Sequence, residues 1–355
     1  MCYNYISTAY DSFSGGIPDM KKHGRLLTVL AGALLVLSLL AGAAAAKELV
    51  VYSSVDEENA KNILDEFSKV SGIQVNMVFL SSGPAMSRIE AEKTNPQADV
   101  WFGAPSENHI VAKDRGLTQP YLPAAAADLA AGFKDPEGYW VAFYMNPLGF
   151  GVLAEELKKD GKPVPASWKD LLDPAYKGMI QMPSPQSSGT AYAMIMTLVE
   201  TYGEDEAFKY MKALNPNIQT YTQSGTGPSK NLAIGETQIA IQFTPAFLKL
   251  VDEGFPASVV FPAEGVGFEA AAMSILKGAK NLDSAKALAD WIVSAEAQKV
   301  LSAKKTYFFP VLSDVSAGEG LPALSEIKLI DYDRIKAAQE KKRIIDRWVT
   351  EVLGQ

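Results

Sequence analysis

The sequence predicts an α/β fold of two lobes, each built on a parallel-sheet core and joined by a two-segment hinge. The chain has 355 residues, which is too many for one ordinary core and suits two. Strand and helix patterns alternate beyond residue 46. Two apolar segments, 139–153 and 259–262, are expected to carry the chain from one lobe to the other and back.

The first lobe begins with three strands that alternate with helices. Asp56 is a suitable N-cap, apolar residues follow it at helical spacing, and Gly72 is placed to end that helix. Pro84 stands just inside the next helix, where a missing N–H is tolerated. This order is typical of a parallel sheet covered by helices. The strands are expected at residues 48–52, 73–80 and 99–103.

The second lobe begins within the segment 139–153, which Asn146 and Pro147 interrupt. The elements expected in it are strands at 178–182 and 238–243 and helices at 189–202 and 204–214. The elements expected to return to the first lobe are a strand at 270–276 and helices at 284–294, 295–303 and 332–352. The predicted lobes are therefore 47–143 with 265–355, and 144–264.

Residues 1–46 are predicted to be a signal peptide with a spurious extension before Met20. Lys21, Lys22 and Arg25 precede a Leu- and Ala-rich stretch without charge, and Ala46 ends a small-x-small cleavage pattern. Cleavage after Ala46 predicts a secreted, periplasmic protein. An uncleaved anchor is the alternative, because the 21 uncharged residues 26–46 just span a bilayer.

Composition excludes several classes of site. Cleavage would remove Cys2, the only cysteine, and leave His109 as the only histidine, which excludes disulfides, a cysteine nucleophile and Cys/His metal sites. The chain has 33 basic and 41 acidic residues, of which three and two lie in residues 1–46. The remaining 30 and 39 give an acidic protein, which is a poor nucleic-acid binder. No catalytic residues, metal site or cofactor are predicted.

Ligands of open α/β sheets bind beyond the carboxyl ends of strands. Here, stretches rich in hydroxyls and glycine follow those ends and precede helix starts, where free N–H groups and partial positive charge bind anions without Lys or Arg. Such residues are also ordinary caps and turns, and that interpretation stays open. The predicted contacts are Ser53, Ser54, Ser82, Gly83, Gly103, Ser187, Ser188, Gly189, Thr190, Gln223, Ser224 and Gly225.

Three further residues near the predicted crossings are expected to complete the site. These are Asn146, Phe243 and Glu269. Glu269 is suited to accept a hydrogen bond from a ligand hydroxyl or amine. Hinge packing remains an equal alternative for Phe243 and for the nearby Tyr144. Closure of the two lobes on the ligand is the expected mechanism.

Blocks of sequence along the whole mature chain resemble bacterial periplasmic solute-binding proteins of ABC transporters, in extracellular solute-binding protein family 1. The likeness is to its ferric-iron/phosphonate-type group. It implies a type II periplasmic-binding fold, no catalysis, and a monomer that docks onto a membrane permease with its ATPase. The blocks are LVVYSS at 49–54, SSGPAMSRIEAEKTNPQADVWFGA at 81–104, YMNPLGFGVL at 144–153, QSSGTAY at 186–192, YTQSGTGPSKNLAIGE at 221–236 and AMSILKGAKNLDSAKALADWI at 272–292.

The resemblance leaves the ligand open. Ferric-iron binders of this group use adjacent tyrosines, and the corresponding stretch here, 242–247, reads QFTPAF without a tyrosine. A small anion such as a phosphonate or organophosphate is therefore predicted, without commitment to a sugar. A ferric-iron protein using oxygen ligands from Tyr52, Tyr144, Tyr221 and Glu269 is the alternative, and a non-covalent enzyme is a remote one.

Overall fold

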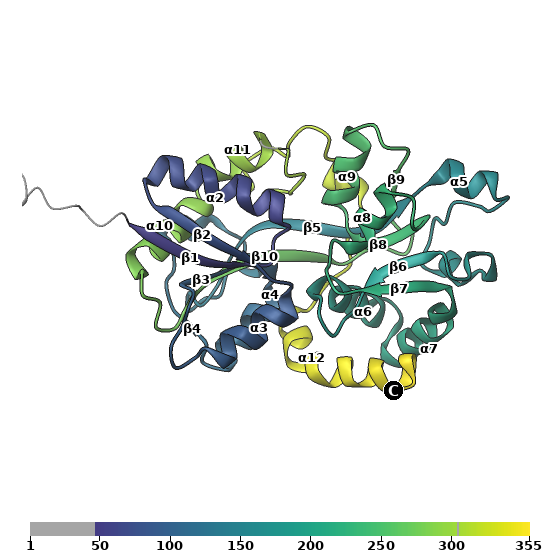
Figure 1. Ribbon diagram of the computed structural model, residues 1–355, viewed down its shortest axis with the longest axis horizontal. Coiled ribbons are helices and arrows are strands. Elements are labelled where there is room, and N and C mark those ends of the chain that lie inside the picture. The colour runs from purple at the N-terminus through teal and green to yellow at the C-terminus, as the bar shows by residue number, and fades with distance from the viewer. Residues whose placement is uncertain (1–46, 304) are drawn as a thin grey trace, which may run out of the picture. The chain divides into compact units, whose positions relative to one another are not determined.

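The computed structural model describes residues 47–303 and 305–355, and a ten-stranded mixed sheet runs through them (Figure 1). Its order is β2-β1-β3-β10-β5-β8-β6-β7, with β4 paired to β10 and β9 to β5. The predicted signal peptide, 1–46, lies outside the described residues. The strands are β1 Glu48–Ser53, β2 Gln74–Phe79, β3 Val100–Pro105, β4 Thr118–Gln119, β5 Val141–Val152, β6 Ile180–Pro183, β7 Ile218–Thr222, β8 Ile239–Phe243, β9 Ser258–Val260 and β10 Phe268–Leu276.

In the first half of the sheet, β1 pairs in parallel with β2 and β3, as the sequence predicts. The local signals for helix α2 are also confirmed: the Asp56 side chain accepts the Asn59 N–H, and Gly72 ends the helix at φ 71°. Its buried face carries Ile63 and Phe67, which pack on the sheet side of this half. The helices of this half are α2 Glu57–Ser71, α3 Ser82–Ala91 and α4 Ser106–Asp114.

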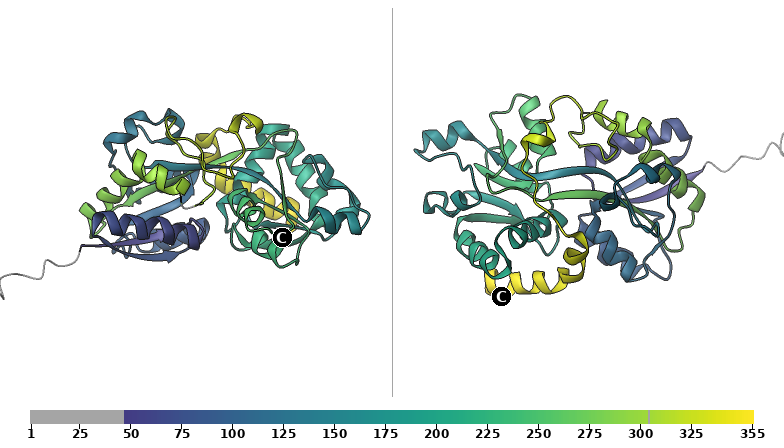
Figure 2. Two further views of the ribbon diagram at one scale, coloured as in Figure 1. Left: turned by 90° about the horizontal axis from the view of Figure 1, so that it is seen from above. Right: turned by 180° about the vertical axis from the view of Figure 1, so that it is seen from behind.

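Strands β5 and β10 connect the two halves (Figure 1 and the right view of Figure 2). They pair antiparallel, with Glu269 opposite Asn146. The start of β5 therefore lies in the first half, and its end pairs antiparallel with β8 and β9 in the second. The sheet is accordingly mixed rather than parallel throughout. Because β9 stays beside the far end of β5, the returning strand is β10 and not the segment 259–262.

The second half of the sheet is covered by apolar helices. Helix α6 is buried along most of its length, since ten of its 14 residues are inaccessible and pack in the core of this half. Trp168 and Tyr176 fill the same core. The helices of this half are α5 Ala154–Lys159, α6 Gly189–Tyr202, α7 Glu204–Leu214, α8 Gly227–Ala233 and α9 Pro245–Asp252.

The C-terminal helices divide between the two cores. Helices α10 Leu282–Ile292 and α11 Ala295–Ala303 pack in the first core through Leu288 and Leu301. Helix α12, Arg334–Trp348, and the π-helical turn Val349–Leu353 contribute Trp348 and Val352 to the second. The lobe boundaries stay a prediction, and these two side chains of the terminal segment lie in the core of the second half. Single 3₁₀ turns lie at Ala124–Asp128, Ala131–Phe133, Lys169–Leu172, Pro174–Tyr176, Asn215–Asn217 and Leu324–Glu326.

No helix within the described ranges is long and apolar enough to cross a bilayer.

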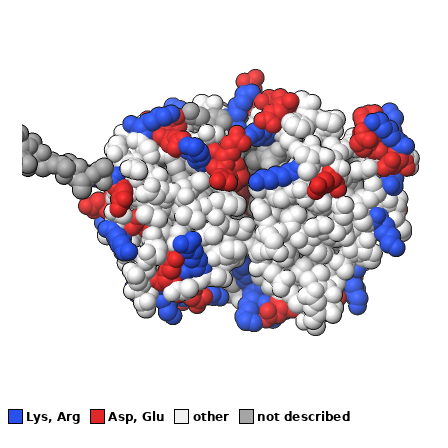
Figure 3. Space-filling model, viewed as in Figure 1, with Lys and Arg blue, Asp and Glu red and all other residues white. Residues whose placement is uncertain are grey.

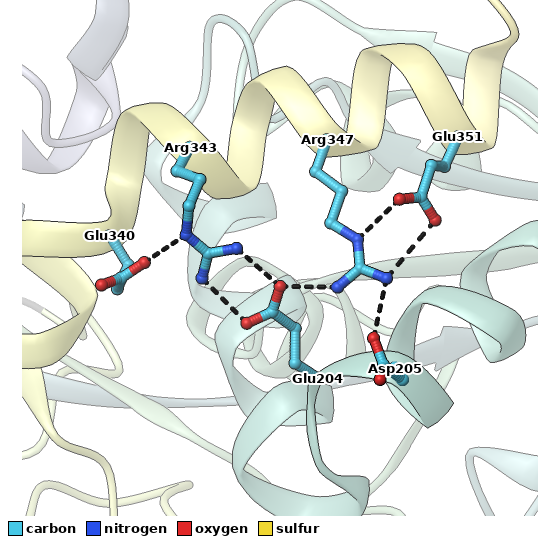
Figure 4. A network of polar contacts seen from close by, with 6 residues as sticks. All are labelled: Glu204, Asp205, Glu340, Arg343, Arg347 and Glu351. Atoms are coloured by element: carbon cyan, nitrogen blue, oxygen red, sulfur yellow. Dashed lines mark hydrogen bonds and ion pairs between the residues drawn. The ribbon is translucent and has the colours of Figure 1, made fainter.

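An ion-pair network fastens α12 to the start of α7 (Figure 4). Glu204 accepts two bonds from Arg343, at 2.7 and 2.8 Å, and one from Arg347 at 2.6 Å. Arg347 also bonds Asp205 at 2.9 Å and Glu351 at 2.7 Å. The hydrogen bonds from Arg343 and then Arg347 lower the pKa of Glu204 to about 2. Bidentate geometry makes this network stronger than isolated surface pairs.

Replacing Glu204 with Gln should lower the free energy of unfolding by about 1 kcal/mol at pH 7 and low salt, after allowance for solvent screening. The difference should shrink in concentrated salt, because the pairs are partly exposed. Urea unfolding of both proteins measures it. Glu206→Gln is the matched control, because Glu206 pairs with Lys209 on its own helix. Equal losses in the two variants would contradict an anchoring role for the network.

Candidate functional site

A cavity of about 70 Å³ lies between the two halves of the sheet, against strands β5 and β10. The residues that form its wall lie at strand ends and helix starts of both halves. Nine of the fifteen residues that the sequence predicts as ligand contacts line it. They are Ser54, Ser82, Asn146, Ser188, Thr190, Ser224, Gly225, Phe243 and Glu269.

The other six predicted residues do not line this cavity. Ser53 is fully buried, and its Oγ accepts the Val55 N–H. Gly103 has φ 82°, and a Cβ there would clash with Val55, so its glycine serves chain packing. Three more, Gly83, Ser187 and Gln223, line a neighbouring cavity together with Arg115 and Lys341. Gly189 lines neither of the two cavities.

Five helices of eight or more residues begin at the wall of the cavity. Helix starts carry N–H groups without intrahelical partners and a partial positive charge, so the starts that no side chain caps favour an anion. Asp56 already caps α2, which leaves the starts of α3, α4, α6 and α9. No Lys or Arg is among the described residues that line it. The residues that present these starts are Asp56 for α2, Ser81 and Ser82 for α3, Pro105 for α4, Ser188 and Thr190 for α6, and Pro245 and Ala246 for α9.

Helices α3 and α6 begin at the cavity wall, but in α3 the Gly83 N–H already donates to the Ser187 carbonyl and Pro84 has no N–H. Their N-cap residues, Ser81 and Ser188, make no side-chain bond to the helix that each precedes. Close by, a Cβ on Gly225 would lie 2.6 Å from Thr190 Oγ1 and 3.1 Å from Ser188 Oγ. Gly225 therefore permits these hydroxyls to gather at the start of α6. Hydroxyls and free N–H groups together form a neutral set of donors for an anion.

Acidic and amide groups occupy the part of the wall on the hinge strands. Asn146 Nδ2 donates to Glu269 Oε1 at 2.9 Å. Burial raises the pKa of Glu269 to about 8, and the nearby carboxyls of Glu107 and Asp56 add to the rise. Burial also raises the pKa of Asp56, which caps α2 and lines the cavity. Burial therefore favours the neutral, protonated form of Glu269.

Aromatic side chains form the apolar part of the wall. Tyr144 and Phe308 stack with their ring centroids 3.9 Å apart. Phe79 and Phe243 also line the cavity. Sequence reasoning missed Phe79 and Phe308; Phe308 comes from the segment after α11, and no local motif marks it. Asp56 was interpreted only as a helix cap, although it follows a strand end just as Ser54 does.

Contacts outside the cavity join the two halves in this structure. The Gly83 N–H of α3 donates to the Ser187 carbonyl at 3.0 Å. Glu58 of α2 pairs with Lys249 of α9. Figure 3 shows charged side chains of both signs gathered between α2 and α9, whereas most of that face is uncharged.

The tyrosines considered as iron ligands are not brought together. The Tyr52 hydroxyl donates a hydrogen bond to the Glu92 carboxylate, and the Tyr221 hydroxyl donates one to Asn215 Oδ1. Neither tyrosine lines the cavity. Only Tyr144 and Glu269 of that set do. Within the described residues, no three His, Cys, Asp or Glu side chains are grouped to hold a metal ion.

Replacing Glu269 with Gln should flatten the pH dependence of stability between pH 5 and 8. The folded-state pKa lies above the ordinary value of 4.5, so the stabilisation is complete below that value and is lost as pH rises toward 8. The wild type should lose roughly 3 kcal/mol more than the variant across this window. Urea unfolding at several pH values measures the difference. Glu204→Gln is the control, because the pKa of Glu204, about 2, places its effect below this window. Parallel pH profiles for wild type and Glu269→Gln would contradict the assignment.

Comparison with known proteins supplies the family. Residues 98–338 match the family described as bacterial extracellular solute-binding protein. The periplasmic binding protein AfuA from Actinobacillus pleuropneumoniae, solved with exogenous fructose 6-phosphate bound, is 39% identical over 86% of this chain and 99% of its own, with a TM-score of 0.84. The periplasmic binding protein P5PA is 36% identical over 86% and 99%, with a TM-score of 0.82.

A sequence relative from Salmonella typhimurium is named as a putative 2-aminoethylphosphonate-binding periplasmic protein, and it is 28% identical over 72% of this chain and 74% of its own. The TM-scores show that this chain has the fold of both solved relatives. The chain therefore belongs to the bacterial extracellular solute-binding proteins, the periplasmic substrate-binding components of ABC importers.

Proposed function

We propose that this protein binds a small phosphate monoester, of the kind that phosphorylated sugars represent, and delivers it as a periplasmic monomer to its ABC permease. The observation that carries the proposal is the convergence of four helix starts without a side-chain cap on one cavity, whose described lining holds no Lys or Arg. A phosphate group presents several acceptor oxygens to such donors and carries the charge that the helix starts favour.

The cavity offers donors for the phosphate group of such a ligand and acceptors for its hydroxyl groups. Ser82, Ser188 and Thr190 supply hydroxyl donors beside the starts of α3 and α6. Asp56 and Asn146 supply acceptors elsewhere in the wall, where ligand hydroxyls would find partners. The fructose 6-phosphate in the AfuA structure has this combination of groups. Ferric iron finds no comparable set, since Tyr52 and Tyr221 are engaged outside the cavity.

Lobe closure is the proposed mechanism. Helix α3 belongs to the first half and α6 to the second, so an anion between them contacts both. A ligand that binds the closed form more tightly than the open form shifts the population toward closure. The closed form then presents both halves to the permease in a fixed arrangement.

A thermal-shift panel tests the ligand class. Fructose 6-phosphate and glucose 6-phosphate should raise the unfolding temperature by several degrees, since a ligand at 100 times its Kd stabilises by about 2.7 kcal/mol. Fructose and ferric citrate should not. Replacing both Ser188 and Thr190 with Ala should weaken fructose 6-phosphate binding at least about tenfold. The double variant Ser71→Ala/Thr201→Ala is the control, because both hydroxyls bond their own helices. A response to ferric citrate alone would refute the proposal.

A methyl group at Gly189 tests closure. Its Cβ would lie 2.9 Å from Ser82 Oγ and Pro105 Cδ in the opposite half, so the clash exists only when the halves meet. Gly189→Ala should weaken fructose 6-phosphate binding about tenfold or more while leaving the unfolding temperature of the ligand-free protein nearly unchanged. Gly132→Ala is the control, because its Cβ would meet no atom closer than 3.7 Å. Unchanged affinity in Gly189→Ala would argue against closure through this contact.

A further inference from the structure

Asn146 carries a buried acceptor that the protein does not satisfy. The residue is 2% exposed and lines the cavity. Its Nδ2 donates to Glu269 Oε1, but Oδ1 has no hydrogen-bond partner among the described residues. Buried acceptors are rarely left unpaired, because each costs a desolvation penalty. An unpaired carbonyl oxygen in the wall of a binding cavity calls for a donor on the ligand.

The position of Asn146 is set by the two hinge strands. Asn146 on β5 and Glu269 on β10 are directly opposite in the antiparallel register. The bond between their side chains therefore joins neighbours on one face of the sheet. With Nδ2 held by Glu269, the amide orientation is fixed and Oδ1 stays available to the cavity.

The groups around Asn146 Oδ1 favour a hydroxyl as the donor. Asn146 Nδ2 already donates to one oxygen of Glu269, and burial raises the pKa of this carboxyl to about 8, which favours the protonated form. Glu107 from α4 and Asp56 from α2 face it, and both reinforce the neutral form. A hydroxyl can donate to Asn146 and accept from Glu269 at once. An ammonium group has no lone pair with which to accept.

We propose that Asn146 is a specificity-determining residue that selects ligands bearing a neutral hydroxyl by accepting its hydrogen bond at Oδ1. This inference rests on the proposed binding of a phosphate monoester and specifies its other end: an uncharged, hydroxylated body rather than an aminoalkyl or a bare alkyl group. The ligand hydroxyl would contact side chains of strands β5 and β10, so its binding would be coupled to the geometry of the hinge.

Isothermal titration with two probes tests the inference. Fructose 6-phosphate carries hydroxyls, and ethyl phosphate shares its phosphate monoester but has none. Asn146→Leu should lose about tenfold to a hundredfold in affinity for fructose 6-phosphate and keep its affinity for ethyl phosphate. Asn146→Asp, which keeps an acceptor oxygen, should still prefer fructose 6-phosphate. Asn217→Leu is the matched control, because Asn217 is buried and bonds the backbone at Leu171 and Asp173, outside the cavity.

The outcomes separate this inference from the proposed function. If neither probe binds the wild type, the phosphate-monoester proposal fails, and the inference fails with it. If both bind but Asn146→Leu weakens them equally, or weakens neither, the role of Asn146 is overturned while the proposed function stands. Tighter wild-type binding of 2-aminoethylphosphonate than of fructose 6-phosphate, weakened by Asn146→Leu, would show that the donor is an ammonium group and also overturn the inference.

Discussion

The antiparallel pairing of β5 with β10 is the constraint on which the rest of the structure depends. All twelve residues of β5 are buried, and the strand pairs first with β10 and then with β8 and β9. One continuous ladder thus joins two cores that otherwise fold around separate helices. Because backbone hydrogen bonds must be kept on both sides, the halves can only bend about this ladder. The cavity lies against it, so any ligand there contacts the hinge directly.

Backbone N–H donors, rather than lysine or arginine, suit a cavity that lies at such a hinge. The chain has a net charge of −8, and the proposed anion would be held by oriented backbone groups, since no Lys or Arg is among the described residues that line the cavity. Helix starts are rigid and need no side-chain ordering when the halves meet. The absence of lysine and arginine from the described lining also avoids burying a cation that would need a partner in the ligand-free protein. Neutral donors from both halves thus allow closure on a charged ligand and release from it.

Much of the fold could be predicted because the residues that begin and end its helices act on their neighbours in the sequence. Asp56 caps the start of α2 and Gly72 ends it, as such residues do in other helices. The hydroxyl-rich stretches after strands likewise precede helix starts. The mixed sheet could not be predicted, since the antiparallel partner of β3 comes from β10, far along the chain. The packing of the terminal helix could not be predicted for the same reason: its amphipathic pattern predicts a buried face but not which core receives it.

The candidate site was partly predictable, and the alternation of side chains along a strand explains some of the misses. Ser53 and Ser54 are adjacent, so they point to opposite faces, and only Ser54 reaches the cavity. Even there, the Ser54 hydroxyl is engaged by Leu80 and Trp101. Phe308 joins the wall through tertiary packing on Tyr144, which no spacing in the sequence reveals.

A crystal structure of the protein with fructose 6-phosphate is the most direct measurement. Anion binding by helix starts predicts the phosphate between the first turns of α3 and α6, with its oxygens bonded to backbone N–H groups and to the hydroxyls of Ser82, Ser188 and Thr190. A phosphate found instead beside Arg115 and Lys341, in the neighbouring cavity, would contradict it.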